Sequence, residues 1–186
     1  MAPQTRTGMF QALSNFQLAR DRAATLSQNL ISLRNDSLQD LLSDFENSEH
    51  KLELVKTIEG VDFVNDSRAT NANAVWFAME STHQPIIWIT NMSSIDLITD
   101  DLQQLIQEKV KIIVIQGVYN NTLEDFFKRM NKDVYAVIGL EDAVRTAFYA
   151  GSSGETVLFS PGVVSSGMHR TYRERGEKFK EAVAQL

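Results

Sequence analysis

The feature that most constrains the fold of this chain is a regular alternation of short apolar segments and helical segments, which starts at residue 61. The expected strands are residues 61–64, 85–90, 111–116, 134–138 and 156–159, and the expected helices are residues 73–81, 100–107, 121–130, 140–150 and 169–185. Such βα alternation with short connections predicts a mostly parallel sheet with right-handed crossovers and helices on both faces. The expected fold class is therefore α/β, with a Rossmann-like sheet.

The residues before position 61 do not follow this alternation. Residues 9–33 carry a broad apolar stripe at helical spacing, which predicts an amphipathic helix. Residues 52–58 alternate apolar and polar side chains, so they are expected to form a half-buried strand and a hairpin with residues 61–64. We expect a helical N-terminal extension over residues 1–36, either an add-on or the remnant of a neighbouring central domain, and a Rossmann-like domain over 37–186.

Charge and residue content exclude several classes of protein. The 24 acidic and 18 basic residues give a net charge of −6, which argues against a nucleic-acid partner. The absence of cysteine excludes thiolate nucleophiles, zinc–thiolate sites and iron–sulfur clusters. The histidines, His50, His83 and His169, are not at metal-ligand spacing, so no metal site is expected. No apolar stretch has the length of a signal peptide core or a membrane span, so we expect a cytoplasmic protein with no membrane partner.

Three loops are candidates for a site, because ligands of open α/β sheets bind beyond the carboxyl ends of the strands. Residues 65–71 (NDSRATN) place an acid, a base, hydroxyls and amides at a strand-to-helix junction, where N–H groups and an arginine suit an anion. Residues 160–167 (SPGVVSSG) are mostly small, which lets a ligand approach the backbone. Residues 90–94 are polar without a further signal. A plain capping loop and an ordinary turn remain the alternatives for the first two loops.

Several nucleotide-binding and catalytic motifs are absent from the sequence. It contains no G-x-G-x-x-G, no GxxxxGK[ST] and no G-x-S-x-G, so neither a dinucleotide fingerprint nor a phosphate-binding P-loop nor a hydrolase elbow is present. Ser165 and His169 lie four residues apart, but no acid is placed to complete a triad. No catalytic residue is assigned, and an independent small enzyme on this sheet has no supporting nucleophile, metal cluster or cofactor loop.

Four strings of residues, taken in order, resemble a known family. They are Glu49–Glu53 (EHKLE), Val61–Asn71 (VDFVNDSRATN), Ser160-Pro161, and Tyr172–Gly176 (YRERG) with Phe179. Together they resemble the C-terminal domain of the muramyl (Mur) ligases, in particular the members that add D-glutamate in peptidoglycan biosynthesis. The resemblance covers roughly residues 36–186.

The resemblance implies a Rossmann-like domain that closes over a central ATPase domain. There it presents the incoming amino acid and contacts ATP, which the family uses with Mg²⁺, while an acyl phosphate forms. Carried over position by position, the implied nucleotide-binding residues are Asp66, Ser67, Arg68 and Asn71, and the implied substrate-binding residues are Thr70, Ser165, Ser166 and Tyr172. D-glutamate and the UDP-muramoyl substrate are implied as partners only together with the family's other domains. A protein partner through the helix 9–33 is a further expectation.

The chain departs from the family pattern at the amino-acid site. The family's GG-x-DKG loop aligns with Asn91–Asp96, so the lysine that grips the glutamate side chain is Ile95 here. The loss of a charge-assisted partner for a carboxylate costs roughly 1.5–3 kcal/mol. The family's SPA-x-ASFD segment has become SPGVVSSG and has lost its acid.

Two hypotheses follow from the retained and the lost motifs. In the first, the chain is a ligase domain that is not competent for ligation alone, since phosphoryl transfer needs a phosphate cradle and metal ligands that these 186 residues lack. In the second, it is a degenerate stand-alone paralogue that acts as a nucleotide-binding or protein-interaction module.

Overall fold

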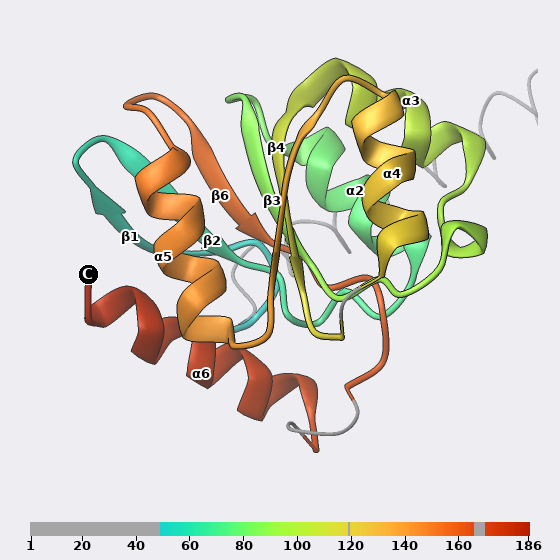
Figure 1. Cartoon of the computed structure of the whole chain (residues 1–186). Coiled ribbons are helices and arrows are strands. Elements are labelled where there is room, and N and C mark those ends of the chain that lie inside the picture. Colours follow the sequence, from blue (N-terminus) through green and yellow to red (C-terminus); the bar gives the residue numbers. More distant parts are fainter. Residues whose placement is uncertain (1–48, 119, 166–169) are drawn as a thin grey trace, which may run out of the picture. The chain divides into compact units, whose positions relative to one another are not determined.

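The computed structural model describes residues 49–118, 120–165 and 170–186 (Figure 1). The elements are β1 (Glu53–Ile58), β2 (Val61–Asn65), α2 (Ala72–Ser81), β3 (Ile86–Thr90), the 3₁₀ turn η1 (Ile95–Leu97), α3 (Asp100–Lys109), β4 (Val110–Gln116), α4 (Asn121–Arg129), β5 (Asp133–Val137), α5 (Leu140–Ala150), β6 (Thr156–Phe159) and α6 (Tyr172–Ala184). The helix expected over residues 9–33 and the domain boundary expected at residue 36 lie outside the described residues.

The six strands form one sheet in the order β1-β2-β6-β3-β4-β5. The β1 and β2 strands pair antiparallel, as the expected hairpin requires, and every other neighbouring pair is parallel. The last strand, β6, inserts between β2 and β3, where Leu158 is paired with Val64 on one side and Trp88 on the other. The expectation of an α/β fold with a mostly parallel sheet is confirmed.

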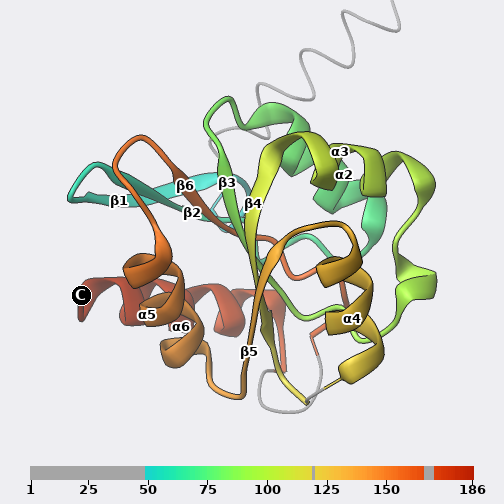
Figure 2. The same ribbon diagram turned by 45° about the horizontal axis from the view of Figure 1, so that its top comes forward.

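Helices cover both faces of the sheet, as Figures 1 and 2 show. Along β3, Ile86 and Trp88 point into the core beneath α2, α3 and α4, whereas Ile87 and Ile89 point into the core beneath α5 and α6. Because both sides of the central strands are buried, these strands read as continuous apolar runs rather than as alternating patterns.

Aromatic pairs anchor a helix on each face. Trp88 meets Phe127 of α4 edge-on at 6.0 Å between ring centroids. Phe159 of β6 stacks on Phe179 of α6 at 4.8 Å, and both rings are fully buried. Such pairs add about 0.5–1.5 kcal/mol each beyond the burial of their area.

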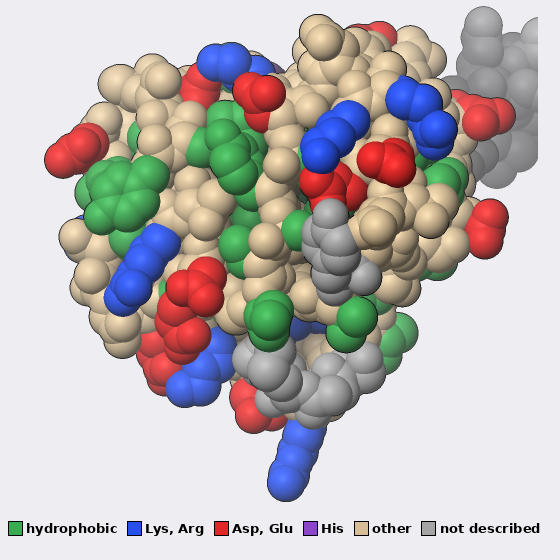
Figure 3. All heavy atoms as spheres, in the orientation of Figure 1, with side chains coloured by type: hydrophobic (Ala, Val, Ile, Leu, Met, Phe, Trp, Pro, Cys, Tyr) green, Lys and Arg blue, Asp and Glu red, His purple; other side chains and the backbone are tan. Residues whose placement is uncertain are grey.

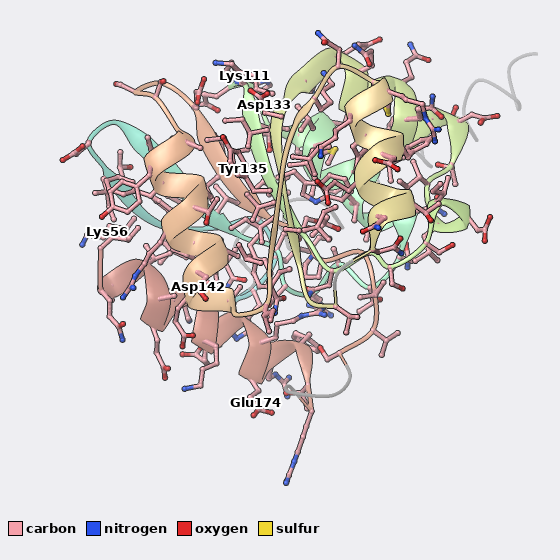
Figure 4. The ribbon with its side chains drawn as sticks, viewed as in Figure 1. Lys56, Lys111, Asp133, Tyr135, Asp142 and Glu174 are labelled. Atoms are coloured by element: carbon pink, nitrogen blue, oxygen red, sulfur yellow. The ribbon has the colours of Figure 1, made fainter. Side chains whose placement is uncertain are left out.

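The last helix begins later than the sequence predicted. Helix α6 starts at Tyr172 and not at residue 169, because Thr171 is its N-cap and accepts a hydrogen bond from the Glu174 N–H at 3.1 Å. The Glu174 carboxylate reaches back to the Arg170 N–H at 2.9 Å, an arrangement close to a capping box, and it lies at the lower end of α6 in Figure 4. The other predicted strand and helix bounds within the described residues agree to within two residues.

Candidate functional site

Three loops meet at the carboxyl edge of the sheet because β6 lies between β2 and β3. We call them the post-β2 loop (residues 66–71), the post-β6 loop (160–165) and the post-β3 loop (91–94). Crevices at such an edge are where open α/β sheets bind their ligands. The fold therefore brings together the three loops that the sequence singled out.

The post-β2 and post-β6 loops are tied by hydrogen bonds. The Asp66 N–H donates to the Phe159 carbonyl at 2.8 Å, and the Ser160 hydroxyl donates to the Asp66 carboxyl at 2.7 Å. The Gly162 N–H donates to the Ala69 carbonyl at 3.1 Å. Gly162 has φ of +73°, and a Cβ there would lie 2.4 Å from the Met92 methyl group, so only glycine fits.

The Asp66 carboxyl is enclosed by the protein, with only 3% of the residue exposed. Burial raises its pKa to about 7, although hydrogen bonds from Ser160 and from the Leu52 N–H and the charges of Lys51 and Arg175 favour the carboxylate. Through its hydrogen bond with Ser160, Asp66 links the post-β2 loop to the post-β6 loop.

Arg175, on the first turns of α6, is the second buried charge at this edge. Its guanidinium donates to the Ser67 carbonyl at 2.8 Å and, through two nitrogens, to the Val163 carbonyl at 3.1 Å each. Burial lowers its pKa to about 10, and Asp66 opposes that shift, so it stays charged at neutral pH. No pattern in the sequence assigned a role to Arg175. The only signal that could have indicated one was its place in the YRERG string.

The post-β3 loop joins the same network. The Asn91 N–H donates to the Pro161 carbonyl at 3.1 Å, and the Asn91 side-chain amide donates to the Gln116 carbonyl at 2.9 Å. The next turn begins at Ser94, whose hydroxyl caps η1, and Ile95 packs against the core beneath α2, α3 and α4. The position that the resemblance aligns with the family's lysine thus holds an apolar side chain that packs on the chain's own core.

The four residues predicted to face the nucleotide divide between the interior and the surface. Asp66 and Ser67 are buried, and the Ser67 hydroxyl donates to the Tyr172 carbonyl at 2.9 Å. Arg68 and Asn71 are exposed. Asn71 is the N-cap of α2, where it accepts a hydrogen bond from the Ala74 N–H at 3.0 Å.

The residues predicted to bind substrate lie around the same edge, with one exception. Thr70 and Tyr172 are half-buried, and the Arg68 guanidinium lies 5.8 Å from the centroid of the Tyr172 ring. The Ser165 hydroxyl is buried and has no hydrogen-bond partner within the described part of the chain. Ser166 lies outside the described residues.

Exposed apolar side chains occur at this edge as well. Val118 follows β4, Ile138 follows β5 and Val164 belongs to the post-β6 loop, and each is at least 70% exposed. Figure 3 shows apolar side chains along this lower edge of the molecule.

One cluster of the described residues has side chains that can ligate a metal ion. Glu49, His50 and Glu177 bring their ligand atoms within 4.8 Å of one another. However, the Lys180 ammonium lies 3.0 Å from Glu49 and 2.8 Å from Glu177, and the Asn65 amide nitrogen lies 3.0 Å from His50 Nδ1. The arrangement fits an ion-paired attachment of α6 to the segment before β1.

A hollow of about 700 Å³ lies at the opposite, amino edge of the sheet. Lys111 and Asp133, labelled in Figure 4, are among its lining residues, and none of the predicted site residues lines it. Within the described residues, no helix combines the length and the apolar character needed to cross a bilayer.

Comparison with known proteins agrees with this fold. No family model matches the chain. Its structure is similar to that of the UDP-N-acetylmuramate–alanine ligase of Thermotoga maritima, with a TM-score of 0.52 and 15% identity over 81% of this chain and 35% of that protein. The chain therefore has the fold of a Mur ligase C-terminal domain.

The sequence relatives are more specific. The chain is 37% identical over 165 residues to the UDP-N-acetylmuramoylalanine–D-glutamate ligase of Bacteroides fragilis, which covers 88% of this chain and 37% of the relative. The ligase of the same name from Porphyromonas gingivalis is 31% identical over 94% of this chain and 39% of its own length. The chain is thus a homologue of D-glutamate-adding ligases and spans well under half the length of these relatives.

Proposed function

We propose that this chain is the nucleotide- and amino-acid-contacting domain of a D-glutamate-adding Mur ligase, and that it does not ligate by itself. The observation that carries the proposal is the joining of the NDSRATN loop to the Ser160-Pro161 loop at one sheet edge, through the Asp66–Ser160 hydrogen bond. The identity to D-glutamate ligases over 88% of the chain supports it.

The nucleotide side of the proposal rests on Arg68. Its guanidinium is exposed at the carboxyl edge, beside the Tyr172 ring, where it fits a phosphate group of ATP. Asp66, by contrast, is poorly placed to coordinate Mg²⁺, because its buried carboxyl already accepts hydrogen bonds from Ser160 and from the Leu52 N–H. We assign no Mg²⁺ ligand to the described residues.

The proposed contacts with the amino acid lack the positive charge that the family's lysine supplies. Ser165, whose buried hydroxyl lacks a described partner, and the half-buried Thr70 suit a carboxylate of D-glutamate. Ile95, however, packs on the protein core where a lysine would pair with the glutamate side chain. This observation favours a second candidate function, a module that binds a nucleotide or a protein and no longer selects D-glutamate.

A titration of Mg-ATP into the ¹⁵N-labelled chain tests the nucleotide side. We expect saturable amide shifts centred on residues 66–71 that are lost in Arg68→Ala, because the guanidinium supplies the phosphate contact. The matched control is Arg129→Ala, which removes another exposed arginine, in the last turn of α4, and should leave the shifts intact. An absence of shifts at millimolar Mg-ATP would contradict the proposal and leave a protein-interaction module.

A further inference from the structure

The buried Arg175 connects the loop assigned to the nucleotide with the loop assigned to the amino acid. We propose that Arg175 is a positioning residue that couples the post-β2 loop to the post-β6 loop, so that a change in one loop alters the geometry of the other. The identity of the ligands rests on the proposed function, whereas the coupling is a property of the ligand-free chain.

The contacts of the guanidinium carry this inference. It binds the carbonyl of Ser67 in the post-β2 loop and the carbonyl of Val163 in the post-β6 loop, at 2.8 and 3.1 Å. Two further hydrogen bonds fix Ser67, since its N–H donates to the Asn65 side chain and its hydroxyl donates to the Tyr172 carbonyl. A displacement of either loop therefore moves an acceptor away from a side chain that also holds the other loop.

The chemistry of arginine suits this connection. The planar guanidinium has five N–H donors in a rigid fork, so it can bind two carbonyls in fixed directions, which the single ammonium of lysine cannot reproduce. Arg175 is only 3% exposed, so water does not compete for these bonds. Asp66 lies close enough to favour its charge, and Asp66 itself is bonded to Ser160 of the post-β6 loop.

One donor of the same side chain is unused. The buried Nε–H of Arg175 has no acceptor among the described residues. A rearrangement of either loop that brought an acceptor to this atom would complete the hydrogen bonding of the guanidinium.

Amide hydrogen exchange of the full chain tests the coupling. Two amides report on the loops: that of Gly162 donates to Ala69 across the two loops, and that of Asp66 donates to Phe159 at the end of β6. In Arg175→Lys both should exchange about tenfold to a hundredfold faster, as expected for the loss of one charge-assisted hydrogen bond. Amides of β3 and β4 should not change. A merely structural role would accelerate the loop and strand amides by the same factor, and that result, or unchanged loop amides, would overturn the proposal.

A control variant and a second measurement on the wild type complete this test of the coupling. Arg173→Lys, an exposed neighbour on α6, is the matched control and should leave all amides unchanged. If Arg175→Lys does not fold, the denaturant dependence of exchange in the wild type decides: coincident opening of Asp66 and Gly162 supports coupling, and independent opening overturns it.

Mg-ATP separates this inference from the proposed function. With coupling, Mg-ATP shifts at residues 66–71 extend to residues 163–165 in the wild type but not in Arg175→Lys. If Mg-ATP causes no shifts in the wild type, the proposed function fails, and the exchange measurement still decides the coupling.

Discussion

At the scale of single residues, burial determines which groups of the NDSRATN loop can meet a ligand. Asp66 and Arg68 are two positions apart in the sequence, yet the first is enclosed and the second exposed. The enclosed carboxyl accepts a hydrogen bond from Ser160 and links two loops, whereas the exposed Arg68 guanidinium lies beside the Tyr172 ring, where we propose that it meets a phosphate. The resemblance implies that both Asp66 and Arg68 bind the nucleotide, but their different burial gives the two side chains different chemical environments.

The raised pKa of Asp66 makes the stability of the protein pH-dependent. Its pKa is about 7 in the folded chain against 3.8 as the ordinary value, so the folded protein binds more protons between these values and stability falls as pH rises through that window. About three pKa units correspond to a change on the order of 4 kcal/mol in the free energy of unfolding. Asp66→Asn should remove this decrease, as measured by urea unfolding from pH 4 to 8.

The control for this prediction is Asp142→Asn, which changes an exposed carboxyl at the start of α5 (Figure 4). It should leave the decrease in place. Parallel pH profiles for Asp66→Asn and the wild type would show that Asp66 titrates normally.

At the scale of elements, helix α6 is held against the site by close packing. Glycine inside a helix costs about 1 kcal/mol relative to alanine, so Gly176 requires a compensating reason. A Cβ at this position would lie 2.3 Å from His50 Nδ1 and 2.4 Å from Ser67 Oγ. The glycine therefore lets α6 approach both the segment before β1 and the post-β2 loop.

Gly176→Ala should destabilise the protein by about 1–3 kcal/mol, because overpacking outweighs the better helix propensity of alanine. The matched control is Gly139→Ala at the N-cap of α5, where the nearest atom to a Cβ is 3.3 Å away and the expected cost is below about 1 kcal/mol. Urea unfolding of both variants measures the difference. Equal stabilities would mean that α6 shifts at no cost.

At the scale of the whole molecule, the domain is a part of what its relatives contain. The chain spans 37% of the Bacteroides fragilis ligase to which it is 37% identical. In the proposed function, its loops supply contacts for nucleotide and amino acid, and ligation depends on further protein groups that cradle the phosphates.

The purified chain should therefore release no phosphate from Mg-ATP in the presence of D-glutamate and the UDP-muramoyl substrate. Ile95→Lys should not restore activity, because it adds a partner for the glutamate carboxylate and no phosphate cradle. Phosphate release is the measurement, and the full-length Bacteroides fragilis ligase assayed in parallel is the control. Ligation by either form of the chain would refute the proposed dependence.

Local patterns predicted most of the described fold. The apolar runs of residues 85–90 and 111–116 identified strands buried on both sides, and the bounds of helices α2 to α5 were predicted to within two residues. The short turn η1 was not predicted. The start of α6 was predicted three residues early, because the apolar periodicity does not mark the N-cap, which Thr171 forms by accepting a hydrogen bond from the Glu174 N–H. The position of the loops after the strands located the candidate site. Neither this rule nor the resemblance indicated a role for Arg175.

By itself, the sequence determined the α/β class and the positions of the loops, since both follow from periodicity and from motifs only a few residues long. The tertiary structure alone decided which side chains of these loops are buried. Asp66 meets Ser160 across 94 residues and Arg175 meets Ser67 across 108, because β6 inserts between β2 and β3 and α6 then packs back on the first loop. Burial of those partners, and with it the pKa of Asp66, depends on contacts between distant segments, which no local pattern encodes.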